Sequence, residues 1–125
     1  MNMTPEQKLK RHIIERSEYN GEITPENVDS TYERLDEDYG LQDAKEEVRQ
    51  SGIKTNIKPP YSRHYESDSV AAQMSDGTWI GWTYWHGGGK HGEPEAIDWM
   101  SEAYELTVVS EEQVTKIKRT FAKIN

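Results

Sequence analysis

The chain has 125 residues, of which 33% are hydrophobic and 30% are charged, and its formal net charge is −8. It has no cysteine, which excludes disulfides, thiol catalysis and cysteine-ligated metal centres. The acidic balance disfavours a nucleic-acid-binding domain, because contacts with phosphates require a basic surface. The length predicts one domain with a modest core, to which the four tryptophans and seven tyrosines contribute much of the buried area.

The first residues, Met1 to Glu6, contain no apolar run of the kind that a secretory signal needs. No segment approaches the roughly 18 consecutive apolar residues of a membrane-spanning helix. We therefore expect a cytoplasmic protein that does not enter a membrane.

Two Thr-Pro pairs predict the starts of helices in the first half of the chain. Thr4 and Thr24 can each cap a helix, and the proline that follows each of them suits the first helical position. We expect helices over residues 5–17 and 25–37, and a third over 41–50. The apolar residues that recur at helical spacing are Leu9, Ile13, Val28, Tyr32, Leu35, Leu41, Ala44 and Val48.

Residues 53–61 include two adjacent prolines, which predict an extended connector. The period of the apolar residues then changes from that of a helix to that of a strand. Residues 70–74 alternate in this way, Ser75-Asp76-Gly77 predicts a turn, and a second strand follows over 78–86. Both faces of this second strand carry aromatic residues, so we expect it either to be central and covered on both sides or to leave one aromatic face for a partner.

The segment that begins Glu93-Pro94-Glu95 predicts a short helix through about residue 102. Strands are expected over 104–108 and 114–124, with a turn at 110–113. The C-terminal part is thus a β-β-α-β-β unit with a mostly antiparallel sheet, and the fold class is α+β. The expected organisation is a helical segment, a connector and an α+β domain, or one compact unit of all three, with boundaries 1–52, 53–61 and 62–125.

Three segments, residues 61–71, the Asp76-Gly77 turn and above all the string from Trp79 to Trp99, resemble a family of small proteins encoded by tailed phages and prophages of enteric bacteria. The resemblance covers roughly residues 24–123. The family has no assigned activity, so the resemblance implies a phage or prophage origin and no mechanism. Family members often have tyrosine where this chain has His86, which weakens an argument that His86 performs chemistry.

Gly87-Gly88-Gly89-Lys90 lies between a predicted strand and a predicted helix, where phosphate-binding loops occur. The spacing departs from the phosphate-binding motif, and no hydroxyl residue follows Lys90 to hold magnesium. Glu93 and Glu95 would repel a phosphate. A connecting loop is therefore the simpler interpretation.

His86, His91, Glu93, Glu95 and Asp98 are residue types that bind zinc or exchange protons. Their spacing lies across a glycine loop and fixes no geometry, and no catalytic triad or other catalytic motif is present. We expect no metal and no cofactor, and the absence of a catalytic motif disfavours an enzyme without excluding one.

Aromatic residues of the Trp79–Trp99 string could stack on nucleic-acid bases, but with this net charge a core role is favoured. Alternating basic residues near the C-terminus are typical of a protected sheet edge; these are Lys116, Lys118, Arg119 and Lys123. The acidic residues of the second and third helices indicate a solvated face, or alternatively a patch for a basic partner; these are Asp36, Glu37, Asp38, Asp43, Glu46 and Glu47.

We expect the protein to bind another protein, of the host or of the phage, through the glycine-rich loop and its aromatic flank. The alternative is a small-ligand or nucleotide-binding module, enzymatic or not, that uses the same loop. The sequence indicates no oligomeric state. The candidate binding residues are Tyr84, Trp85, His86, Gly87, Gly88, Gly89, Lys90, His91 and Glu93.

Overall fold

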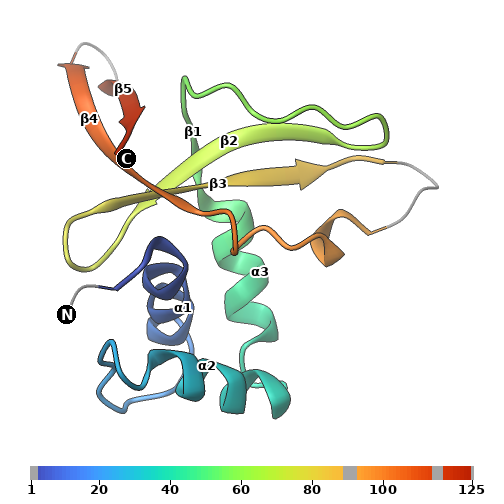
Figure 1. Cartoon of the computed structure of the whole chain (residues 1–125), viewed down its shortest axis with the longest axis vertical. Coiled ribbons are helices and arrows are strands. Elements are labelled where there is room, and N and C mark those ends of the chain that lie inside the picture. The colour runs from blue at the N-terminus through green and yellow to red at the C-terminus, as the bar shows by residue number, and fades with distance from the viewer. Residues whose placement is uncertain (1–2, 89–92, 114–116, 125) are drawn as a thin grey trace.

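The computed structural model describes residues 3–88, 93–113 and 117–124, and in these ranges three α-helices precede a five-stranded antiparallel sheet (Figure 1). The fold class is therefore α+β, as predicted. No helix of the described ranges is long and apolar enough to cross a membrane. The elements are α1 (Pro5–Glu15), α2 (Val28–Glu37), α3 (Gln42–Ser51), β1 (Ile53–Lys54), β2 (Glu66–Gln73), β3 (Trp79–His86), the 3-10 helix η2 (Pro94–Ala96), β4 (Tyr104–Gln113) and β5 (Ile117–Lys123).

The sheet has the order β1-β2-β3-β4-β5, so β3 is the central strand and has cover on both faces, as expected. Ile80 and Trp82 face the helices and are fully buried in a cluster that includes residues of α1, α2 and α3. On the opposite face Trp79 packs edge-on against Phe121, with ring centroids 5.2 Å apart. The helices and the sheet thus share one core, and a smaller cluster lies on the other side of the sheet.

The first helix begins at the predicted residue, Pro5, whereas the second begins three residues later than predicted. Thr4 and Gln7 make a reciprocal capping box at the start of α1. Thr24 makes the same kind of reciprocal bond with Asn27, so α2 begins at Val28 and residues 25–27 form a turn.

The predicted helix over 93–102 is wrong, and with it the α element of the β-β-α-β-β order. Only Pro94–Ala96 is helical, as one 3-10 turn, and Ile97 is already extended at φ −72° and ψ 134°. The Asp98 carboxylate then accepts hydrogen bonds from the backbone N–H groups of Met100 and Ser101, both at 3.2 Å. This local bonding competes with helical bonding, and it turns the chain toward β4.

Two further boundaries differ from the prediction. The connector over 53–61 begins with the strand β1, in which Ile53 pairs with Ala71 of β2. The turn expected at 110–113 is instead part of β4, which is irregular between Val108 and Ser110. The register shift leaves Val109 exposed and lets the strand continue past the bulge.

The side chain of Asn56 joins the two ends of the sheet. Its Oδ1 accepts a hydrogen bond from the Phe121 backbone N–H at 2.7 Å, and its Nδ2 donates to the Phe121 carbonyl oxygen at 3.2 Å. An amide side chain therefore bonds β5 as a neighbouring strand would, although Asn56 follows β1 at the other end of the strand order. We call this pair of bonds the Asn56 latch; it closes the sheet around the Trp79–Phe121 cluster.

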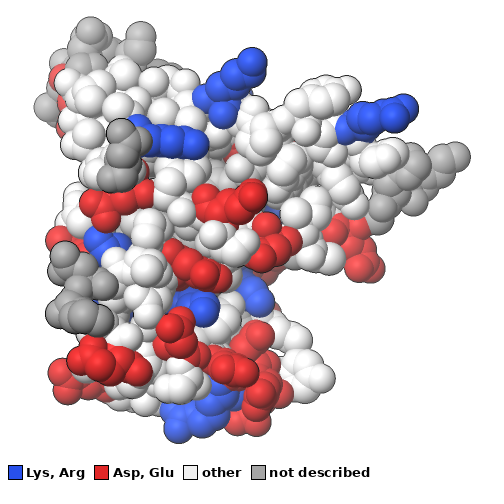
Figure 2. Space-filling model, viewed as in Figure 1, with Lys and Arg blue, Asp and Glu red and all other residues white. Residues whose placement is uncertain are grey.

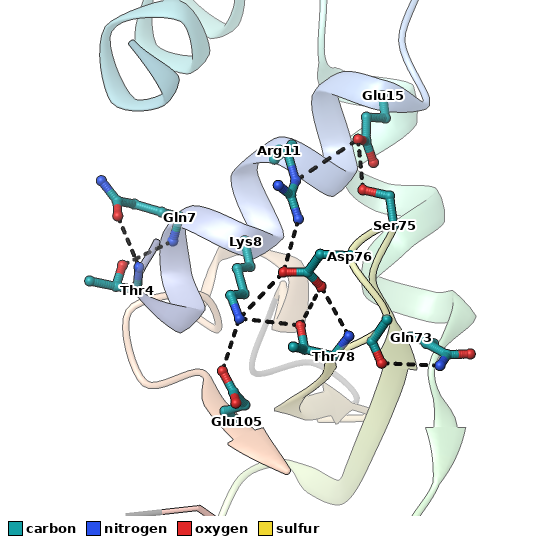
Figure 3. Close-up of polar contacts among 11 residues, drawn as sticks. Thr4, Gln7, Lys8, Arg11, Glu15, Gln73, Ser75, Asp76, Thr78 and Glu105 are labelled. Atoms are coloured by element: carbon teal, nitrogen blue, oxygen red, sulfur yellow. Dashed lines mark hydrogen bonds and ion pairs between the residues drawn. The ribbon is translucent and has the colours of Figure 1, made fainter. Parts of the chain in front are cut away.

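A polar network fastens α1 to the turn between β2 and β3 (Figure 3). The Lys8 ammonium lies 3.5 Å from an Asp76 carboxylate oxygen and 3.0 Å from Glu105 of β4, and Arg11 lies 3.4 Å from Asp76. Asp76 also accepts hydrogen bonds from both the N–H and the hydroxyl of Thr78. Partial burial raises the pKa of Asp76, but the Thr78 bonds and the Lys8 and Arg11 charges outweigh it and lower the pKa to about 2.

Replacing Asn56 with alanine should remove the latch and lower the free energy of unfolding by about 1–2 kcal/mol, because two backbone groups of Phe121 lose their partner. Urea denaturation measures the loss, and faster hydrogen exchange of the Phe121 amide localises it. The exposed Asn20→Ala serves as control. Unchanged exchange at Phe121 would contradict the latch.

Asp76→Asn should lower stability at neutral pH by about 1 kcal/mol, a value reduced for the partial exposure of this carboxylate. Because the folded pKa of about 2 is below the ordinary 3.8, the stabilisation is fully present above about pH 4 and is lost as pH falls toward 2. The variant should therefore lose less stability than the wild type over this window. Thermal melts between pH 2 and 7 test this, with the exposed Asp38→Asn as control.

Candidate functional site

The structure places the candidate binding residues on both sides of the sheet. Tyr84 and His86 lie on the helix-facing side of β3, whereas Trp85, one position away, lies on the opposite side because strand side chains alternate. Gly87 and Gly88 follow the strand, and Glu93 precedes η2. The remaining three, Gly89, Lys90 and His91, are outside the described residues.

Both imidazole nitrogens of His86 face carboxylates. Nε2 lies 3.0 Å from Asp68 and Nδ1 lies 3.6 Å from Glu66, and the ring stacks on Tyr84 at 5.0 Å between centroids. Burial raises the pKa of Asp68, but hydrogen bonds from His86 and Lys54 outweigh it and hold the pKa below its ordinary value. His86 thus joins the ends of β2 and β3, and the surrounding charge favours a cation over a phosphate.

Gly87 and Gly88 are required by backbone conformation. Their φ angles are +74° and +88°, which side-chain-bearing residues rarely adopt. A Cβ on Gly88 would also lie 2.7 Å from the Tyr65 ring. The two described glycines of the run are therefore explained by their left-handed backbone and, at Gly88, by the closeness of the Tyr65 ring.

Arg49 of α3 contacts the end of β3, the strand that precedes Gly87. Its guanidinium donates to the Trp85 carbonyl oxygen at 2.7 Å, pairs with Glu46 at 2.8 Å, and lies over the Tyr84 ring at 5.0 Å. The Trp82 indole N–H in turn donates to the Arg49 carbonyl oxygen at 3.2 Å. These contacts fix β3 against the end of α3.

A second candidate surface is a cleft of about 470 Å³ between the helices and residues 96–100. We call it the acidic cleft. We call its apolar and aromatic lining residues the floor; they are Tyr32, Ala96, Ile97, Trp99 and Met100. We call its charged lining residues the rim; they are Glu6, Asp29, Glu33, Asp36 and Asp98, with Lys10 and Lys45.

Tyr32 is the centre of the acidic cleft. It is 8% exposed, and its hydroxyl lies 3.6 Å from the Met100 sulfur. Burial, followed by the negative charges of Asp36, Glu6 and Asp98, raises the pKa of Tyr32 far above its ordinary value. The phenol therefore stays neutral, and its ring presents a π face to cations.

The sequence predicts Tyr32 in the core and Asp36 on a solvated face, and it does not predict that both residues line one cleft. The cleft depends on the non-helical path of residues 97–100, for which the sequence predicts a helix. The one signal of this cleft in the sequence is the excess of acidic residues in the first half of the chain. On the face shown in Figure 2, acidic side chains predominate over the helical half.

Metal-ligating side chains and the C-terminal basic residues are the remaining candidates from the sequence. Within residues 3–88, 93–113 and 117–124, no three His, Asp or Glu side chains form a group that could hold a metal ion. Of the C-terminal basic residues, Arg119 lies over the Trp79 ring at 5.4 Å and Lys123 over the Tyr104 ring at 4.3 Å. Lys116 and the Lys118 side chain are outside the description.

Arg49→Met should lower the free energy of unfolding by about 2–3 kcal/mol, because it leaves the Trp85 carbonyl and the Glu46 carboxylate without their charged partner. Chemical denaturation measures the loss. Lys54→Met removes a cation that is 78% exposed and should change stability by less than about 0.5 kcal/mol. Equal effects of the two substitutions would contradict the role given to Arg49.

Comparison of the chain with protein-family models, with curated proteins and with solved structures finds no match in any of the three.

Proposed function

We propose that this chain is a small phage or prophage accessory protein that acts in the host cytoplasm by binding another protein, and that the acidic cleft receives the partner. The observation that carries the proposal is the combination of an apolar floor and a charged rim in one concave surface. Binding sites typically combine apolar concavity with a few convergent polar groups.

The charge distribution supports a protein partner over a nucleic acid. Residues 1–52 hold 13 acidic and 7 basic side chains, and this half of the chain builds most of the cleft. A phosphate backbone would be repelled from such a surface, whereas a basic protein surface would be attracted to it.

The glycine-rich loop stays a predicted part of the binding surface. Its described polar and aromatic members are Tyr84, Trp85, His86 and Glu93. The alternative function, binding of a nucleotide at this loop, is not favoured by the described neighbours, because Glu66 and Asp68 place negative charge beside Gly87.

Affinity capture from extracts of infected cells tests the proposal with two matched variants. Ile97→Asp puts a charge on the floor of the cleft, and Val109→Asp puts the same charge on the exposed bulge of β4. A partner should be recovered by the wild type and by Val109→Asp, and at least tenfold less by Ile97→Asp, since a buried unpaired charge at an interface costs more than about 1.4 kcal/mol.

Thermal melts of both variants check that folding is intact. Equal recovery by all three proteins, or no partner with any of them, would contradict the proposal. Thermal shift with nucleotides and divalent cations tests the alternative, since a ligand at 100 times its Kd adds about 2.7 kcal/mol of stability.

A further inference from the structure

We infer that the occupant of the acidic cleft is a basic, amphipathic segment of the partner, with lysine or arginine side chains among the carboxylates of the rim and an apolar side chain on the floor. This inference rests on the proposed function and specifies the chemistry of the partner. Three features of the cleft support it.

The cleft already binds ammonium groups of its own chain. The Nζ atoms of Lys10 and Lys45 lie 5.5 Å and 5.7 Å from the centroid of the Tyr32 ring. Each is balanced by a carboxylate, Asp29 at 2.9 Å for Lys10 and Asp36 at 3.9 Å for Lys45. An aromatic face with a carboxylate beside it is the arrangement that recognises cationic side chains.

The two lysines do not neutralise the cleft, because five carboxylates line it. Two of them, Asp29 and Asp98, are held in the ionised form by hydrogen bonds. A hydrogen bond from Lys10, followed by one from Gln7, lowers the pKa of Asp29, and hydrogen bonds from Ser101 and Met100 lower the pKa of Asp98. The side chains of Asp29 and Asp36 remain 57% and 40% exposed, so incoming cations can reach them.

The floor of the cleft would contact an apolar side chain of the partner as well. Of the apolar lining residues, Trp99 and Met100 are buried and Ile97 is partly exposed. A free amine would use only the rim, whereas a segment with basic and apolar residues on adjacent faces would use both parts. The lysines of the cleft occupy the positions that the partner's cations would take, so they compete with them.

The test measures fluorescence anisotropy of a labelled peptide of about 11 residues, three helical turns, with lysine and leucine at amphipathic spacing. The comparison peptide has glutamine in place of every lysine. We expect the lysine peptide to bind at least fivefold tighter than the glutamine peptide, and added salt to reduce the difference.

Substitutions should change the affinity in opposite directions. Asp29→Asn with Asp36→Asn should weaken binding of the lysine peptide about fivefold, and Lys10→Met with Lys45→Met should strengthen it. The control for net charge is Glu37→Gln with Asp38→Asn, two exposed positions of α2 and its end that do not line the cleft. This control should change the affinity less than twofold.

Three outcomes would overturn the inference. They are equal or tighter binding of the glutamine peptide, weaker binding after the lysine substitutions, and displacement of the peptide by spermine at equal concentration, which would identify a small amine as the occupant. If the glutamine peptide binds as tightly as the lysine peptide and Ile97→Asp abolishes the binding of both, only the inferred charge of the partner is wrong. If Ile97→Asp changes neither peptide binding nor partner capture, the proposed function at this cleft fails as well.

Discussion

Burial of the Trp82 indole between the sheet and the helices determines how the two layers meet. Its ring is fully buried, packs against Trp99 at 5.5 Å, and donates its N–H to the end of α3. Gly52, the residue after α3, passes so close that an added Cβ would lie 3.0 Å from the indole and 2.8 Å from Val70. The direction of α3 and the position of residues 97–100 therefore both depend on this one side chain, and so does the shape of the acidic cleft.

Much of the fold could be predicted because the determining signals are local. Thr4 caps α1 through Gln7, three residues away, and alternating aromatic residues indicated that β3 is central. The failures lie where distant or competing contacts decide. Glu93-Pro94-Glu95 carries a helix-start signal, but the hydrogen bonds that Asp98 accepts end the helix after one turn. The bonding of Asn56 to Phe121 spans 65 positions and leaves no periodic pattern in the sequence.

The candidate site was predictable only in part, for a related reason. The segment from Trp79 to Trp99 does contain the end of β3 followed by glycines with positive φ. However, strand side chains alternate between the two faces of the sheet, so Trp85 lies on the opposite face from Tyr84 and His86. The acidic cleft draws its lining from α1, α2, the start of α3 and residues 96–100. None of these segments alone resembles a binding motif. Tyr32 in particular has the spacing of a core residue, and only the charges of Asp29, Asp36, Lys10 and Lys45 around it distinguish it from one.

The Asn56 latch has a consequence for the order in which the protein gains and loses structure. All four strand pairings join strands that are consecutive in the chain, so they can form early through short-range contacts. The latch joins residues 65 positions apart, so without the strand ladders its closure would carry a larger loop-closure entropy than the contacts between consecutive strands. Because it consists of two hydrogen bonds from one side chain, we expect it to open at a lower free energy than the strand ladders beside it. Opening of the latch would then loosen the contact beside the Trp79–Phe121 pair without global unfolding.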